Sequence, residues 1–384
     1  MKKFKPTSLI YTFFLAFVFI AGFSKSALAA NVDSLVPVFD DKLIEERIKN
    51  IPTVMNLEFN QDVKMFIDLY TIRKRALTEK ILGKAEYYFP LFEQVLDANQ
   101  MPLELKYLTV IESAVEPAAT SCAGAAGLWQ FIRGTGKMYG LKVDKFVDER
   151  RDPVESTMAA AKFLKELYGM YHDWLLALAA YNCGPGYVTK ALRLAGKDAS
   201  FWDIYKYLPR ETRSYVPAFI AAVYTMNHYK DHNLSPFYYD LPNKVDTVKL
   251  DANVNLYSIA ELTKVPIEVL AKLNPQFTKK YIPYSSKGYM ITMPTEKMCK
   301  CISLTDSIDA LTAKSKVPYN AVVAEFYPAN LTKVYYTVRA GDNLGQIAMK
   351  YKTQVTKLKE WNNLNSTLIR VGQRLIVYVN DKNT

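Results

Sequence analysis

The chain has 384 residues, of which half are hydrophobic, and it carries a formal net charge of +11. This length exceeds the need of one average domain, and the apolar share can supply a sizeable core. The positive charge suits anionic envelope polymers or membrane surfaces. No nucleic-acid motif accompanies it, so we expect no nucleic-acid partner.

The first 29 residues have the pattern of a signal peptide. A basic start with three lysines precedes an uncharged apolar run at residues 9–23, and Ala27-Leu28-Ala29 is a small-x-small cleavage signal. The apolar run is short for a membrane span, and no long apolar segment follows it. No cysteine near the cleavage site suggests a lipid anchor. We therefore expect an exported chain that begins near Ala30, with a charge of +7 after the loss of four lysines.

Helical patterns dominate the next two hundred residues. The segment Asp152-Pro153-Val154-Glu155 predicts a helix start, with a capping aspartate, a proline in the first turn and a capping-box glutamate. Every residue from Trp174 to Tyr181 is apolar, which indicates a buried central helix. We predict a helical arm over residues 30–85 and a compact all-α domain over residues 86–235.

The last third of the chain changes character. Strand-like runs at 335–339 and 374–379 enclose two short helical patterns in the order β-α-α-β. We expect Asp342 to cap the first of these helices. This pattern predicts a small domain over residues 334–379.

An internal repeat extends this prediction to an earlier segment. A shift of 88 residues aligns Leu256 with Leu344, Ile259 with Ile347, Leu270 with Leu358 and Asn274 with Asn362. Residues 245–296 are therefore predicted to be a diverged copy, and residues 297–333 a linker or a degenerate repeat.

Glu112 is the first candidate for chemistry. With Leu105 and Leu108 it has the spacing i, i+3, i+7, so on a helix it shares their apolar face. Burial disfavours the charged form of a carboxyl and raises its pKa, as a general acid near neutral pH requires. By spacing alone, a salt-bridged surface glutamate is the more common explanation.

The residues around Glu112 are far more specific. Glu112-Ser113 is followed by Pro117, Ala119, Ser121, the run Gly124–Phe131, and then Ala180-Tyr181-Asn182-x-Gly184. From about Tyr87 to Tyr224 the chain resembles the lytic transglycosylase (SLT) domain of the goose-type-lysozyme-like superfamily, in particular the membrane-bound lytic murein transglycosylase D group.

This resemblance implies roles for single residues. Glu112 matches the catalytic acid/base, and Tyr181 matches the tyrosine whose hydroxyl helps to orient it. The residues implied to bind substrate are Ser121, Gln130 and Asn182 near the cleaved bond, and Glu211, in Glu211-Thr212-Arg213-x-Tyr215-Val216, near the stem peptide. Core packing and stacking on substrate are both open for Trp129.

The C-terminal segment resembles a LysM domain, with its opening at Tyr336–Leu344 and its ending at Val371–Leu375. Such modules bind glycans that contain N-acetylglucosamine. The earlier copy has Ala252-Asn253-Val254 where the later one has Ala340-Gly341-Asp342, so we expect weaker sugar binding there. The predicted fold is multidomain: an all-α lysozyme-like catalytic domain followed by small β-α-α-β LysM domains.

These resemblances imply a lytic transglycosylase, a lyase that cleaves the bond between N-acetylmuramic acid and N-acetylglucosamine in peptidoglycan and forms a 1,6-anhydro product. We expect a monomer in the periplasm or cell envelope that binds glycan strands, with peripheral contact to the outer membrane and no cofactor or metal. A goose-type lysozyme that hydrolyses the same bond, and a non-catalytic LysM scaffold, are the alternatives. A pure binder has no need of both Glu112 and Tyr181.

Two further patterns are weaker. The four cysteines allow three pairings, and Cys122 and Cys183 flank motifs that converge on one groove, so a disulfide between them is the pairing to test. His228 and His232 have the i, i+4 spacing of zinc ligands. They lack a third ligand, and we interpret them as a surface helix end.

Overall fold

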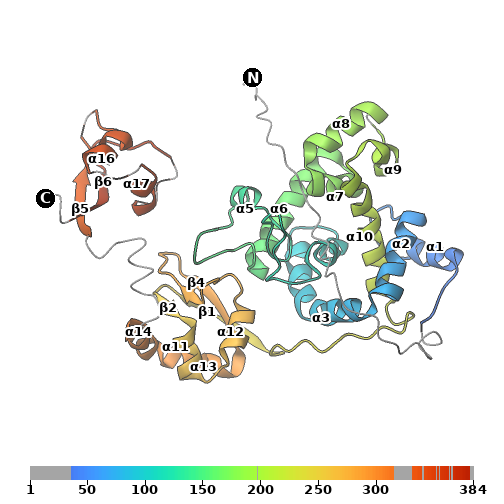
Figure 1. The fold of residues 1–384 in the computed structure, drawn as a ribbon, viewed down its shortest axis with the longest axis horizontal. Coiled ribbons are helices and arrows are strands. Elements are labelled where there is room, and N and C mark those ends of the chain that lie inside the picture. The colour runs from blue at the N-terminus through green and yellow to red at the C-terminus, as the bar shows by residue number, and fades with distance from the viewer. Residues whose placement is uncertain are drawn as a thin grey trace. The chain divides into compact units, whose positions relative to one another are not determined.

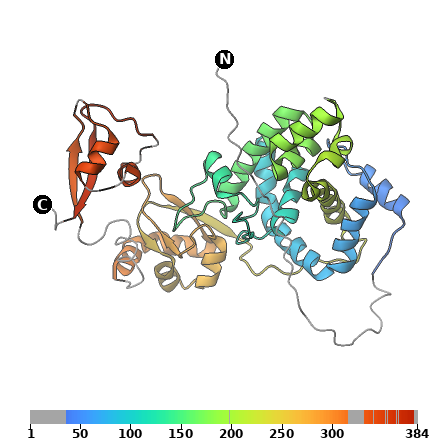
Figure 2. The ribbon, with the colours of Figure 1, turned by 45° about the horizontal axis from the view of Figure 1, so that its top comes forward.

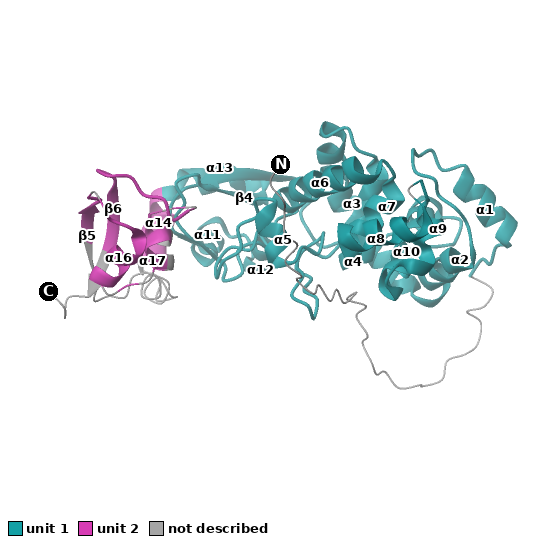
Figure 3. Ribbon diagram, turned by 90° about the horizontal axis from the view of Figure 1, so that it is seen from above, with its two compact units in different colours: residues 1–305 teal, residues 306–384 magenta. Residues whose placement is uncertain are grey.

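The computed structural model describes residues 36–196, 198–314, 331–339, 341–351, 353, 355–362, 364 and 366–380. The predicted signal peptide, residues 1–29, lies outside these residues. The chain divides into two compact units, up to Thr305 and from Asp306 onward (Figure 3). Within the described ranges, no helix is both long and apolar enough to cross a membrane.

The region expected to be a helical arm forms four successive elements. They are α1 (Asp41–Lys49), α2 (Gln61–Asp68), the π-helical turn η1 (Leu69–Arg73) and α3 (Arg75–Ala98). Asp40 and Asn60 cap α1 and α2 by accepting backbone N–H groups. Because α2 packs against α10 (Arg210–His228), this region belongs to the core of the helical domain.

The rest of the helical domain surrounds one buried helix. The other elements are η2 (Leu103–Tyr107), α4 (Leu108–Ser113), α5 (Arg133–Met138), α6 (Pro153–Tyr171), α7 (Trp174–Cys183), α8 (Pro185–Ala195), α9 (Phe201–Ile204) and η3 (Tyr205–Tyr207). Every residue of α7 after Trp174 is buried, and α7 packs against α6, α8 and α10 (Figure 1; Figure 2). The predicted central helix is confirmed.

The start of α6 follows the prediction for the aspartate cap and the proline but not for the capping-box glutamate, because the Asp152 N–H donates to the Glu149 carbonyl. Asp152 accepts hydrogen bonds from the N–H groups of Val154 and Glu155, and Pro153 occupies the first turn. A proline costs nothing there, since its missing N–H would have no partner inside the helix.

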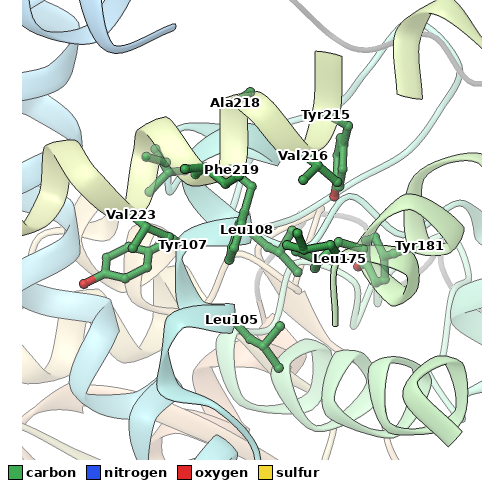
Figure 4. Packing of buried hydrophobic residues seen from close by; sticks show 14 of the residues in the cluster. Leu105, Tyr107, Leu108, Leu175, Tyr181, Tyr215, Val216, Ala218, Phe219 and Val223 are labelled. Carbon is green, nitrogen blue, oxygen red and sulfur yellow. The ribbon is translucent and has the colours of Figure 1, made fainter. Parts of the chain in front are cut away.

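One continuous apolar core holds these helices together. Figure 4 shows part of it, where Leu105 and Leu108 lie beneath α10 with Phe219 and Val216. Trp129 belongs to this core: it is fully buried and its indole N–H donates to the Thr157 hydroxyl at 2.9 Å. Core packing therefore accounts for Trp129, and stacking on substrate does not.

A small domain follows the helical domain within the first unit. Its elements are β1 (Val245–Leu250), β2 (Val254–Asn255), α11 (Leu256–Thr263), α12 (Ile267–Leu273), β3 (Tyr281–Ile282) and β4 (Tyr289–Pro294). β1 and β4 pair antiparallel, as do β2 and β3. Two helices, α13 (Thr295–Ser303) and α14 (Thr305–Lys314), come next in the sequence.

The later small domain repeats this arrangement. β5 (Leu331–Thr337) pairs antiparallel with β6 (Arg374–Asn380), and α16 (Leu344–Lys350) and α17 (Val355–Trp361) lie between them in sequence. One prediction here is wrong: Asn343, not Asp342, caps α16. The Asp342 carboxylate instead accepts from the Tyr336 hydroxyl and the Arg339 N–H, which fixes the turn before the helix.

Two equivalent asparagines confirm the repeat. Asn274 donates its amide to the carbonyls of Leu270 and Thr292 and accepts from the Thr292 N–H. Asn362, 88 positions later, makes the same three bonds with Leu358 and Ile376. In both copies one side-chain amide joins the second helix to the last strand.

Candidate active site

Glu112 lies in the last turn of α4, at an abrupt end of the helix. The helix ends at Ser113, and the two residues that follow it have left-handed backbones: φ is 53° at Ala114 and 55° at Val115. Such conformations are costly for residues other than glycine and persist only where the surroundings enforce them. The Ser113 hydroxyl lies 2.9 Å from the Leu128 carbonyl, which ties the helix end to the loop that follows.

The Glu112 side chain faces a cavity of about 350 Å³. Its wall combines one side of α6, the end of α7 and the loop between α4 and α5. Five of the six residues predicted from the sequence line this one cavity: Glu112, Ser121, Gln130, Tyr181 and Asn182.

Burial is the main influence on the pKa of Glu112. Desolvation by the surrounding protein raises its pKa from 4.5 to about 7, although part of the side chain remains open to the cavity. The Tyr215 hydroxyl donates to Glu112 Oε1 at 2.6 Å, which favours the carboxylate and works against the shift. Near neutral pH both forms of Glu112 are accordingly accessible.

Tyr215, rather than Tyr181, provides the hydroxyl that contacts Glu112. The Tyr181 hydroxyl donates to the Trp129 carbonyl at 2.7 Å, and its ring lies 5.1 Å from that of Phe163. Because that proton is already shared with a buried carbonyl, Tyr181 holds the 128–130 loop in place. Figure 4 shows Tyr181 and Tyr215 reaching the same region from different helices.

The sequence did contain a signal for Tyr215. Tyr215 belongs to the same motif as the predicted site residue Glu211, and it lies one helical turn after Glu211 on α10. Glu211 itself is exposed in the first turn of α10, and it is not one of the described residues that line the cavity.

Ser121 and Gln130 are fixed by the loop that carries them. The Ser121 hydroxyl accepts the Ala125 N–H at 3.0 Å, and the Gln130 amide donates to the Gly127 carbonyl at 2.8 Å. Gln130 has a left-handed φ of 47°. Asn182 is held on the opposite side, where it accepts from the Thr212 hydroxyl at 2.9 Å.

A second carboxylate, not singled out from the sequence, also lines the cavity. Glu166 on α6 is exposed and accepts the Tyr139 hydroxyl at 2.6 Å. Glu116 pairs with Lys84 at 2.7 Å and is not among the described residues that line this cavity.

The weaker patterns have structural explanations. All four cysteines, each within the described ranges, are free, so the suggested Cys122–Cys183 bond is not formed. Cys183 is buried and its thiol donates to the Ala179 carbonyl, whereas Cys122 is exposed. His228 pairs with Asp231, but His232 is buried against Tyr224, so only the first belongs to a surface helix end.

Comparisons with known proteins define the class. Residues 90–203 match the Transglycosylase SLT domain, residues 336–377 the LysM domain, and residues 244–310 the Lytic transglycosylase MltD, LysM-like domain. The class is therefore an SLT transglycosylase with LysM modules.

Individual relatives narrow this class. The chain is 32% identical to the membrane-bound lytic murein transglycosylase D of Escherichia coli (strain K12) over 84% of its own length and 70% of that protein's. It belongs to the membrane-bound lytic murein transglycosylase D family. It is also 35% identical to the membrane-bound lytic murein transglycosylase F of Maricaulis maris over 32% of this chain and 29% of that one. The solved structure of the 70 kDa soluble lytic transglycosylase SLT70 from Escherichia coli is 24% identical, with a TM-score of 0.33, over 40% of this chain and 26% of that one.

Proposed function

We propose that this protein is a lytic transglycosylase that cleaves the β-1,4 bond between N-acetylmuramic acid and N-acetylglucosamine in peptidoglycan, with Glu112 as its acid/base. The observation that carries the proposal is a single buried carboxyl, with a pKa of about 7 and a hydroxyl donor, facing a cavity. A group poised near the working pH is suited to both halves of proton transfer.

The reaction needs two proton transfers at one residue. Protonated Glu112 gives its proton to the bridging oxygen as the C1–O bond of the muramic acid breaks. The resulting carboxylate then takes the proton of the muramic acid C6 hydroxyl, whose oxygen closes on C1. The products are a free N-acetylglucosamine 4-hydroxyl and a 1,6-anhydro sugar, and Glu112 returns to its starting form. Because the nucleophile is already part of the substrate, no second reactant has to be recruited.

The surrounding residues supply position rather than protons. Burial raises the pKa of Tyr215 well above 10, so its phenol stays a hydrogen-bond donor through both steps. We assign Ser121, Gln130 and Asn182 to glycan binding, because these polar residues line the same cavity as Glu112. For Glu211 we retain a contact with the stem peptide, outside this cavity.

Glu166 is the residue that could act as the second carboxylate if the enzyme were a hydrolase. In a lysozyme-like enzyme that inverts configuration, a second carboxylate activates water. We propose instead that Glu166 is not a base, since it is exposed and engaged by Tyr139. Mass spectrometry of products from purified sacculi separates the two mechanisms. We expect 1,6-anhydro ends from both the wild type and Glu166→Gln, about 18 Da lighter than hydrolytic ends because no water is added. Reducing muramic acid ends would establish hydrolysis.

For location and partners, we propose an exported protein of the bacterial cell envelope that acts in the periplasm as a monomer. The segment at residues 334–379 would hold it on the wall through its LysM fold, and contact with the outer membrane would be peripheral. Fractionation of the native cells, with and without a protease that reaches only the periplasm, tests the location.

A further inference from the structure

The earlier LysM-like domain is joined to the catalytic domain by main-chain hydrogen bonds. The Asp148 N–H donates to the Gln276 carbonyl at 2.9 Å, and the Thr278 N–H donates to the Phe146 carbonyl at 3.0 Å. Val147 and Phe277 form an antiparallel bridge between them. Residues 276–278 thus extend a short stretch of the catalytic domain, at residues 146–148, as a second strand would.

Side chains strengthen this junction. Phe277 is buried and packs edge-on against Tyr289, with ring centroids 5.6 Å apart. The Tyr289 hydroxyl is hydrogen-bonded to the Lys142 ammonium group of the catalytic domain. The Thr278 hydroxyl adds a bond to the Lys145 carbonyl at 3.0 Å. Residues 276–278 lie between α12 and β3, and Tyr289 is the first residue of β4, so two segments of the small domain form the junction.

The corresponding connection of the later LysM domain contains two exposed apolar residues. Its residues 364–373 join α17 to β6, and within them Leu368 is 84% exposed and Val371 is 69% exposed. The two copies share a fold down to the asparagine that joins helix to strand. In the earlier copy Gln276 and Phe277 are buried at the junction, although Tyr284 further along the same connection is 63% exposed. A surface occupied by a protein neighbour is not free to bind a glycan.

The covered junction lies next to the residues that hold the active-site loop. Both oxygens of the Asp148 carboxylate accept from the Arg150 guanidinium at 2.8 Å. Arg150 then donates to the carbonyls of Gly124 at 2.8 Å and Phe131 at 3.0 Å. Asp148 and Arg150 are both buried, and a bidentate pair of this kind has a fixed geometry.

Those two carbonyls bracket the run Gly124–Phe131, which contains Gln130 and begins three residues after Ser121. Gly127, in the middle of the loop, has a φ of 84° and lies so close to the Arg150 carbonyl that a Cβ atom would approach its oxygen to 1.6 Å. Arg150 and its backbone therefore act as the template against which the loop folds.

We infer that the LysM-like domain at residues 245–296 positions the active-site loop, through the 146–148 strand and the Asp148–Arg150 pair, instead of serving mainly as a second glycan anchor. Wall binding then falls to residues 334–379. In this division Asp148 and Arg150 are positioning residues, because they contact the loop and not the reacting bond.

The test uses the full chain with variants at the junction. Phe277→Ala removes the buried ring, and the double variant Thr278→Val with Tyr289→Phe removes two side-chain hydrogen bonds while keeping shape. Tyr284→Ala is the matched control, since Tyr284 belongs to the same domain but is 63% exposed. Each protein is measured for amide hydrogen exchange, for turnover of a soluble glycan fragment, and for retention on insoluble peptidoglycan.

We expect both junction variants to speed exchange at Asp148 and Thr278, and with them at Ser121, Ala126 and Gly127, whose N–H groups bond within the loop. Turnover of the soluble fragment should fall at least about fivefold, because a 1 Å misplacement of a positioning group can cost on the order of 100-fold. Retention on the wall should not change, and Tyr284→Ala should match the wild type.

The inference is overturned if the junction opens, as reported by exchange at Asp148 and Thr278, while loop exchange and turnover stay at wild-type values. It is equally overturned if junction variants lose wall retention and keep turnover, since the domain would then be an anchor. The turnover measurement depends on the proposed function, whereas loop exchange does not, so a wrong reaction and a wrong positioning role give different results.

Discussion

Replacing Glu112 by glutamine removes the charge of the side chain and keeps its shape, so the variant measures what ionisation of this buried group costs. In the unfolded chain the carboxyl has a pKa near 4.5, and in the folded protein about 7. Below pH 4.5 both states are protonated and Glu112 has no effect on the pH dependence. Between pH 4.5 and 7 the unfolded state ionises first, so stability falls as pH rises.

The magnitude follows from the width of this window. At about 1.4 kcal/mol per pKa unit, the shift from 4.5 to about 7 costs the folded state at most about 3.5 kcal/mol by pH 8. The opening of Glu112 to the cavity allows solvent to screen part of this cost, so we expect roughly 2 kcal/mol. Glu112→Gln should therefore be as stable as the wild type at pH 4 and more stable at pH 8.

Denaturant unfolding of both proteins across pH 4–8 tests this difference, because all other titrating groups are common to the pair. The same variant should bind wall material and release no soluble sugar, since an alkoxide is a poor leaving group without a proton. A difference in unfolding free energy that stays constant from pH 4 to 8 would refute the raised pKa. Full activity of the variant would refute the assignment of Glu112 as the acid.

Four further outcomes are expected. Tyr215→Phe removes a bond that lowers the Glu112 pKa, so the alkaline limb of the pH–rate profile should move to higher pH; an unmoved limb would contradict the contact. Gly127→Ala should destabilise the protein by about 1–3 kcal/mol in thermal unfolding, because its Cβ would overlap the Arg150 carbonyl; a wild-type melting temperature would contradict this. In pull-downs, residues 334–379 should bind insoluble peptidoglycan and residues 245–296 more weakly, so equal retention would count against the division between the copies. N-terminal sequencing of exported protein should give Ala30, and a lipid-modified or intact N-terminus would reject the signal-peptide prediction.

The helical framework could be predicted because its signals are local. The capping of α6 by Asp152 and the burial of α7 each depend on neighbours in sequence. The LysM repeat was visible because the same apolar spacing recurs 88 residues apart. Asp342 was misassigned as a cap for a local reason too: two adjacent polar residues can each cap, and the bond from Tyr336 decides which one does.

The hydrogen bonds and walls of the site could not be predicted in the same way, because they depend on contacts between segments that are distant in sequence. Tyr215 and Tyr181 both end near Glu112, and which hydroxyl bonds to it follows from how α10 packs on α4. Glu166 reaches the cavity only because α6 forms one of its walls. Neither fact has a local signature in the sequence, although the motif that contains Tyr215 marked the correct segment.

In the reaction that we propose, the opposing influences on Glu112 allow one carboxyl to serve in both halves. Burial alone would favour the acid so strongly that the carboxylate, once formed, would be a costly intermediate. The bond from Tyr215 stabilises that carboxylate, and it is made by a phenol whose own pKa is too high to compete for the proton. A pKa near 7 is thus a balance between desolvation by the surrounding protein and one fixed hydrogen-bond donor. The donor comes from α10, whereas two of the three residues that we propose to bind the glycan, Ser121 and Gln130, come from the loop beside Arg150. The third, Asn182, is held by Thr212 of α10, so this helix contributes to both the protonation of Glu112 and the proposed glycan site.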